Sequence, residues 1–135
     1  MYLSQLNLEK KHLFLDLELY ISKTDGDFSD GERAIIDSHC IEMQIDNNNY
    51  TCELPLDEVI SMLSSKCSVQ EKHIVFLELA ATVLADEVYR TSEKQLMKRL
   101  AETLDISCED TAQAFTLIRK MKDAYEGCAQ FVMGE

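Results

Sequence analysis

A short acidic segment is the first place in this sequence where residue types and spacing suggest chemistry. Residues 24–32 read TDGDFSDGE and carry four carboxylates, two glycines and two hydroxyls in nine positions. Carboxylate and hydroxyl oxygens are the ligands that Ca²⁺ and Mg²⁺ prefer. The segment therefore presents three alternatives: a calcium loop, another kind of cation site, or a turn between two helices.

A standard calcium loop of the EF-hand type does not fit the spacing. Such a loop needs oxygen ligands at positions 1, 3 and 5, a glycine at position 6 and a glutamate at position 12. Counting from Asp25, position 6 is Asp30 and position 12 is Ile36. Because both the glycine and the bidentate glutamate are missing, we exclude an EF-hand.

The same residues also make a well-formed turn without any metal. Gly26 suits the left-handed conformation that ends many helices. Ser29 and Glu32 have the spacing of a capping box for the next helix. Asp30 adds negative charge to the first turn of that helix, where the helix dipole favours it. Helix capping and a cation site remain the two alternatives.

The acidic turn belongs to a unit that occurs twice. Residues 9–21, EKKHLFLDLELYI, align with residues 71–83, EKHIVFLELAATV. After one skipped residue the alignment continues through the second acidic segment, ADEVYRTSE, at residues 85–93. It pairs Asp25 with Asp86, Phe28 with Tyr89, Glu32 with Glu93 and Ile45 with Ile106. This pattern indicates an internal duplication of a helix–turn–helix unit, with copies at about residues 9–46 and 71–107.

The spacing of apolar residues predicts helices throughout the chain. One stripe in the first helix consists of Leu13, Phe14, Leu17, Tyr20 and Ile21, and a second strip of Leu15 and Leu19. Residues 74–85 are apolar nearly all round, so we expect this helix to be the most buried. Pro55 opens a short helix over about residues 56–65, and Ser107 opens a long last helix. The expected stripe of that last helix consists of Ala114, Leu117, Ile118, Met121 and Tyr125.

These elements predict one domain over residues 1–135, in the all-α class. Its architecture would be a helical bundle of about six helices built from two pseudo-symmetric helix–turn–helix units. Asp16 and Glu78 interrupt otherwise apolar runs, and a buried carboxylate needs a partner or an edge position. The pseudo-symmetry of the bundle could bring these two residues and the two acidic turns to one place.

Charge restricts the class of partner. The net charge is −12, with −9 in residues 1–60 (4 − 13) and −3 in residues 61–135 (9 − 12). Nucleic acids and anionic membranes need a basic face, so both are excluded as partners, whereas cations and a basic protein remain. No apolar run is long enough to span a membrane, and the N-terminus lacks the pattern of a signal peptide. We therefore expect a cytoplasmic protein.

Motifs of enzymes are absent. The five cysteines form no CxxC pair and are expected to be buried free thiols; the three histidines are isolated and belong to no metal-binding pair. No G-x-S-x-G nucleophile motif occurs, nor the Glu-x-x-His pairs of helical di-metal enzymes. A carboxylate-based metal-dependent hydrolase is the enzymatic alternative, and a non-enzymatic module is the interpretation that we favour.

An apolar helix leading into DGDFSDGE, followed by a helix that ends in an I-x-M-x-I pattern, resembles the TerB family associated with bacterial tellurite resistance. The duplication, LPLDEVISML and ADEVYRTSE extend this resemblance over nearly the whole chain. It implies an all-helical cytoplasmic interaction or scaffold module of a stress-response system, with no enzymatic activity. We also expect protein partners of basic character, with a homodimer as the alternative.

The resemblance also implies an acidic cluster that binds a divalent cation, Ca²⁺ or Mg²⁺. Carried over by position, the metal-ligand candidates are Asp25, Asp27, Glu32, Asp86 and Glu93, with Glu87 as an addition. Glu87 stands where the first copy has Gly26. This departure weighs against a symmetric ion site.

Overall fold

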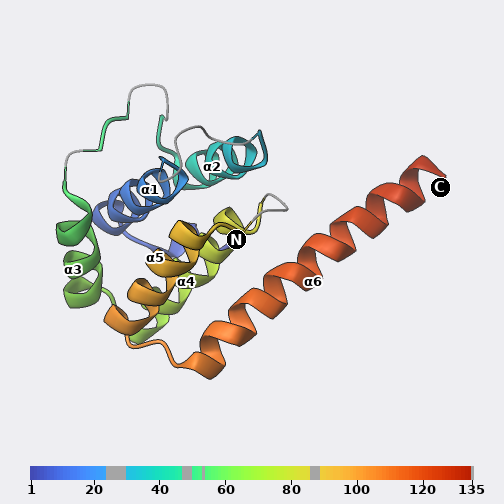
Figure 1. Ribbon diagram of the computed structural model, residues 1–135. Helices are drawn as coiled ribbons and strands as arrows, with labels where there is room; N and C mark the ends of the chain where they lie inside the picture. Colours follow the sequence, from blue (N-terminus) through green and yellow to red (C-terminus); the bar gives the residue numbers. More distant parts are fainter. Residues whose placement is uncertain (24–29, 47–49, 53, 86–88, 135) are drawn as a thin grey trace.

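The computed structural model describes residues 1–23, 30–46, 50–52, 54–85 and 89–134. This part of the chain is an all-α bundle of six helices, preceded by one short 3₁₀ helix (Figure 1). The elements are η1 (Leu3–Gln5), α1 (Leu8–Lys23), α2 (Asp30–Met43), α3 (Leu56–Lys66), α4 (Val69–Val83), α5 (Thr91–Thr103) and α6 (Cys108–Met133). The predicted fold class is therefore confirmed.

Local capping groups explain where several helices begin. Pro55 is the N-cap of α3, as its position in the sequence predicts. The Ser107 side chain accepts a hydrogen bond from the Asp110 N–H at 3.0 Å and opens α6. Ser68 and Glu71 form a complete capping box at the start of α4. Each such cap stabilises its helix by about 1 kcal/mol.

Helix α4 lies at the centre of the bundle. It packs against α1, α2, α5, α6 and η1, and its Val75, Leu79 and Ala80 side chains are fully buried. Helix α1 is buried almost as completely, because α2, α3 and α4 all pack against it. Both apolar strips predicted for α1 are therefore covered by neighbouring helices.

The two predicted copies end their second helices in the same way. Gln44 after α2 and Asp105 after α5 both have left-handed backbone conformations, with φ of 60° and 57°. The next residues, Ile45 and Ile106, donate their N–H groups to carbonyls five positions back, at 2.9 and 2.8 Å. This hydrogen bond is that of a Schellman motif. The correspondence between Ile45 and Ile106 is the one in the sequence alignment.

Helix α6 corrects the sequence prediction about its apolar stripe. Phe115 and Ile118 are buried against the bundle, but Leu117, Met121 and Tyr125 are 44%, 38% and 75% exposed. Met121 and Tyr125 are exposed because the C-terminal half of α6 extends beyond the other helices (Figure 1), whereas Leu117 lies in the first half of α6 and lines a separate pocket. The expectation of buried thiols is wrong for the same helix, since Cys108 and Cys128 are exposed, whereas Cys40 and Cys67 are buried.

No helix in the described part of the chain is both long enough and apolar enough to cross a membrane.

Candidate functional site

A buried ionic cluster connects the two copies of the repeat. His39 of α2 lies between Glu18 of α1 and Glu78 of α4. Its Nδ1 is 2.5 Å from Glu18 Oε2, and its Nε2 is 3.1 Å from Glu78 Oε2. Glu18 Oε2 also accepts a hydrogen bond from the Thr82 hydroxyl at 2.7 Å. Both carboxylates are buried, with exposed fractions of 0% and 1%.

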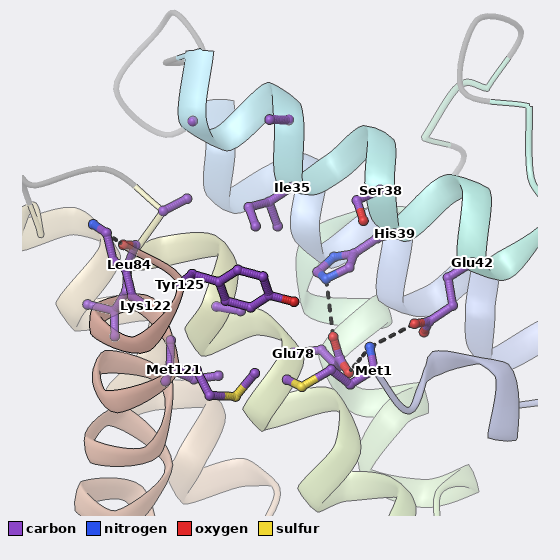
Figure 2. Close-up of a pocket in the computed structure, with 15 residues that line it drawn as sticks. Met1, Ile35, Ser38, His39, Glu42, Glu78, Leu84, Met121, Lys122 and Tyr125 are labelled. Atoms are coloured by element: carbon purple, nitrogen blue, oxygen red, sulfur yellow. Dashed lines mark hydrogen bonds and ion pairs between the residues drawn. The ribbon is translucent and has the colours of Figure 1, made fainter. Parts of the chain in front are cut away.

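The amino group of Met1 extends this cluster toward the surface. It lies 2.7 Å from Glu42 Oε1 and 2.9 Å from Glu78 Oε1 (Figure 2). The N–H groups of Tyr2 and Leu3 donate to the same two carboxylates, both at 2.8 Å. Residues 1–3 are therefore held against α2 and α4 by charge-assisted hydrogen bonds, which are stronger than neutral ones.

The contacts determine the charge states of the cluster. Burial opposes the charge on His39, but hydrogen bonds to Glu18 and Glu78 outweigh this effect and raise the pKa of His39 to about 9. Burial likewise disfavours the Glu78 anion. Hydrogen bonds from His39, the Met1 amine and the Tyr2 N–H nevertheless lower the pKa of Glu78 to about 2. At neutral pH, His39 is therefore a cation next to a buried Glu78 anion.

A cavity of about 420 Å³ lies beside this cluster. His39 and Glu78 form part of its wall, and Tyr125 reaches from α6 toward His39 (Figure 2). The remaining wall is mostly apolar and comes from α2, the end of α4 and α6, including Ile35, Leu84, Ile118 and Met121. The cavity therefore combines one ionic end with an apolar wall.

The geometry of His39 limits what this site can do chemically. A general base must have a free nitrogen within hydrogen-bond reach of the proton that it removes. Both ring nitrogens of His39 instead face carboxylates, and its raised pKa keeps the ring protonated. In this conformation the cluster stabilises the contact between α1, α2 and α4 and offers no base to a substrate.

The predicted metal ligands fall into two groups. Asp25, Asp27, Asp86 and Glu87 lie outside the described residues. Glu32 and Glu93 lie in the first turns of α2 and α5 and are both buried. Glu93 Oε1 accepts a hydrogen bond from the Arg90 N–H at 3.1 Å, so this carboxylate takes part in capping α5. Among the described residues, no three His, Cys, Asp or Glu side chains are arranged to hold a metal ion.

One described residue from each acidic segment lies against the other. Gly31, in the first turn of α2, lies against the backbone of Ala85, which follows α4. A Cβ atom placed on Gly31 would be 2.7 Å from the Ala85 carbonyl oxygen. Only glycine allows this approach without a shift of the backbone. The start of α2 is thereby held against the end of α4.

Asp16 and Glu78 do not share a site, although the two copies align them. Asp16 accepts a hydrogen bond from the Tyr50 hydroxyl at 2.5 Å and lines a separate cavity. Glu78 binds His39 and the Met1 amine instead. Each buried carboxylate has the partner that its burial requires, but the partners come from different parts of the chain.

The sequence analysis missed Glu18 and His39. Glu18 interrupts the same apolar run as Asp16, so the argument that identified Asp16 and Glu78 applies to it equally. His39 carries no local signal, because its two partners are 21 and 39 positions away in the sequence. His39 is isolated in the sequence, and in the structure it has a structural role as the centre of the cluster.

In comparisons with known proteins, the chain matches no protein-family model, no curated protein and no solved structure.

Proposed function

We propose that this protein is a non-enzymatic, TerB-like interaction module that binds a divalent cation, Ca²⁺ or Mg²⁺, between its two acidic turns. In this proposal the module acts in the cytoplasm as part of a bacterial stress response of the tellurite-resistance type. The ligands are drawn from Asp25, Asp27, Glu32, Asp86, Glu87 and Glu93. The cation links the two copies of the repeat and prepares the surface that protein partners bind.

The observation that carries the proposal is the contact between Gly31 and Ala85. Each residue lies within or directly beside one acidic segment, and the two backbones touch. This contact between described residues of the two segments supports the proposal that carboxylates from both segments act on one cation. Oxygen-only ligands favour a hard cation, and bringing this much like charge together without a counter-ion is unfavourable.

The non-enzymatic part of the proposal rests on His39. The described residues place this histidine between two carboxylates, with no ring nitrogen left for a substrate. The cytoplasmic part rests on the five cysteines, which are all free thiols. The link to stress response rests on the resemblance to the TerB family.

The test is cation-dependent stability at constant ionic strength. A cation that binds only the folded state raises the melting temperature, by an amount that grows with the logarithm of its concentration above Kd. We expect millimolar Ca²⁺ or Mg²⁺ to stabilise the wild type more than Na⁺ does, and calorimetric titration to show about one site per chain. Fixed ionic strength separates binding from simple screening of the acidic surface.

The double change Asp25→Asn with Asp86→Asn should abolish the difference between divalent ions and Na⁺. The control variant, Glu58→Gln with Glu126→Gln, removes two carboxylates from exposed positions on α3 and α6 and should keep it. An identical response of the wild type to Na⁺ and to divalent ions would leave helix capping as the role of the acidic turns.

A further inference from the structure

The exposed half of α6 carries an apolar face that nothing in the described bundle covers. Residues 123–134 contain only two charged side chains, Asp123 and Glu126. Tyr125, Phe131 and Val132 are 75%, 85% and 82% exposed. At 100° per residue the apolar side chains of this half, apart from Met133, occupy an arc of roughly 160°. Asp123, Glu126 and Gln130 lie on the opposite face.

This face has the spacing of a coiled-coil seam. Its residues are Ala114, Ile118, Met121, Tyr125, Cys128 and Val132. Steps of four and three residues alternate along this series, which is the repeat by which one α-helix packs against another. Ile118 is buried in the bundle, whereas the seam from Met121 onward becomes increasingly exposed. One continuous seam is therefore covered over its first part only.

We propose that the α6 helices of two copies of this chain pair in antiparallel orientation along this seam. In the register that pairs the exposed parts of the two seams, Met121 faces Val132 of the partner subunit, and Tyr125 faces Cys128 of the partner subunit. The pairing is self-complementary, as a two-fold symmetric interface requires.

The antiparallel register also covers the cavity beside the ionic cluster. Ile118, Met121 and Tyr125 line that cavity from the side of α6 (Figure 2). The C-terminal end of the partner's α6 runs along Met121 and Tyr125 in the proposed register. The apolar wall that Ile35 contributes from α2 then becomes part of the interface. One contact thus buries both apolar surfaces.

The exposed area is sufficient for a dimer of modest size. An aromatic side chain presents roughly 150–250 Å², so Tyr125 and Phe131 together expose about 300 Å² in each chain. With Met121 and Val132 the exposed apolar area of this face reaches roughly 500 Å² per chain, in the upper part of the range for the largest apolar patch of a monomer. Two copies would bury about 1,000 Å², the size that a specific interface needs at least.

The composition of the seam favours binding of a second copy over binding of a basic partner. Its exposed residues carry no charge, and the only acidic side chains nearby, Asp123 and Glu126, lie away from the seam. A basic partner would instead seek the strongly acidic first half of the chain. Two chains of net charge −12 repel each other at a distance, so salt should strengthen this association by screening. Binding of a basic partner would be weakened by salt.

Mass measurement by light scattering or sedimentation tests the pairing on the full chain. At about 100 μM, well above the micromolar dissociation constants of weak interfaces, the wild type should have twice the mass of one chain. Tyr125→Asp with Val132→Asp should reduce it to the mass of one chain. Leu8→Asp with Val69→Asp adds the same charge at two exposed apolar residues outside α6 and should leave the dimer intact.

Circular dichroism of both double variants should show an unchanged helical content, because all four side chains are exposed. The proposal is wrong if the wild type remains at the mass of one chain at high salt. It is equally wrong if a basic helical peptide, rather than a second copy, occupies the seam.

Cysteine cross-linking tests the orientation. In a background with Cys108→Ser and Cys128→Ser, chains with Met121→Cys should cross-link to chains with Val132→Cys when the two are mixed and oxidised. Neither variant should cross-link efficiently to itself. Strong cross-linking of each variant with itself would indicate a parallel pair and would overturn the antiparallel register.

Discussion

The two segments that the sequence alignment pairs, residues 9–46 and 71–107, end their second helices in the same way and differ in what fills their interior. Both end their second helix with a left-handed residue, Gln44 or Asp105. In the first copy, Glu18 and His39 make a buried ionic contact. The alignment places Ala80 and Leu100 at these positions in the second copy, and both are fully buried.

This difference shows that the same helix–turn–helix geometry accommodates either a polar cluster or apolar packing. A buried ionic cluster stabilises the fold only while every member keeps its partner. Apolar packing depends on volume and tolerates the loss of one contact more easily. The first copy is therefore the more sensitive half, although it is no more buried than the second.

The largest expected loss of stability comes from a core position that the two copies share. Leu17 of α1 and Leu79 of α4 are aligned and fully buried. Leu17→Asp or Leu79→Asp would place an unpaired charge in the shared core, which costs more than about 4 kcal/mol. We expect both variants to lose the cooperative thermal transition in circular dichroism. A normal melting temperature for either one would contradict the central position of its helix.

The next largest loss of stability is expected from a change in the first copy alone. His39→Leu gives the first copy the residue of the second, and leaves Glu18 and Glu78 buried without their shared cation. Breaking a buried ion pair from one side costs about 3–5 kcal/mol in the free energy of unfolding. We expect urea denaturation to show a loss of this size.

Adding Glu18→Ala to His39→Leu should recover part of the stability, because this double change reproduces the Ala80 and Leu100 pair of the second copy. Glu78 keeps the Met1 amine and the Tyr2 N–H as partners in that variant. The control is His73→Leu at an exposed position of α4, which should change stability by less than about 0.5 kcal/mol. A double variant less stable than His39→Leu alone would contradict this explanation.

The smallest expected effect is a pH dependence that comes from His39 of the first copy. The pKa of His39 rises from 6.5 in the unfolded chain to about 9 in the folded protein. Its contribution is therefore complete below pH 6.5 and is lost as the pH rises through 9. The free energy of unfolding should fall by up to about 3 kcal/mol over this interval.

The groups that surround His39 determine how this titration is measured. They are Glu18 on α1, Glu78 on α4, Cys40 and Glu42 on α2, and the Met1 amine. The pKa of the Met1 amine is also raised, so this group contributes in the same direction. The difference between the wild type and the Glu18→Ala, His39→Leu variant isolates His39. A difference that stays constant from pH 6.5 to 9.5 would rule out a charged His39.

The sequence by itself determined the helices, the caps at Pro55 and Ser107, and the alignment of the two copies. These features depend on local spacing: the 3.6-residue period of Leu13, Leu17 and Ile21, and the three-residue step from Ser107 to Asp110. It also predicted correctly that Asp16 and Glu78 need partners, because the cost of burying a carboxylate does not depend on the fold. It did not identify which groups are the partners of these two carboxylates.

Only the tertiary structure decided which groups meet. Glu18, His39 and Glu78 lie on three different helices, and no local pattern records a contact across such separations. The structure also decided that the stripe of α6 leaves the bundle after Ile118, because periodicity shows that one face of a helix is apolar but not which surface covers it. Covering depends on the lengths and angles of the packed helices, which exist only once the chain has folded.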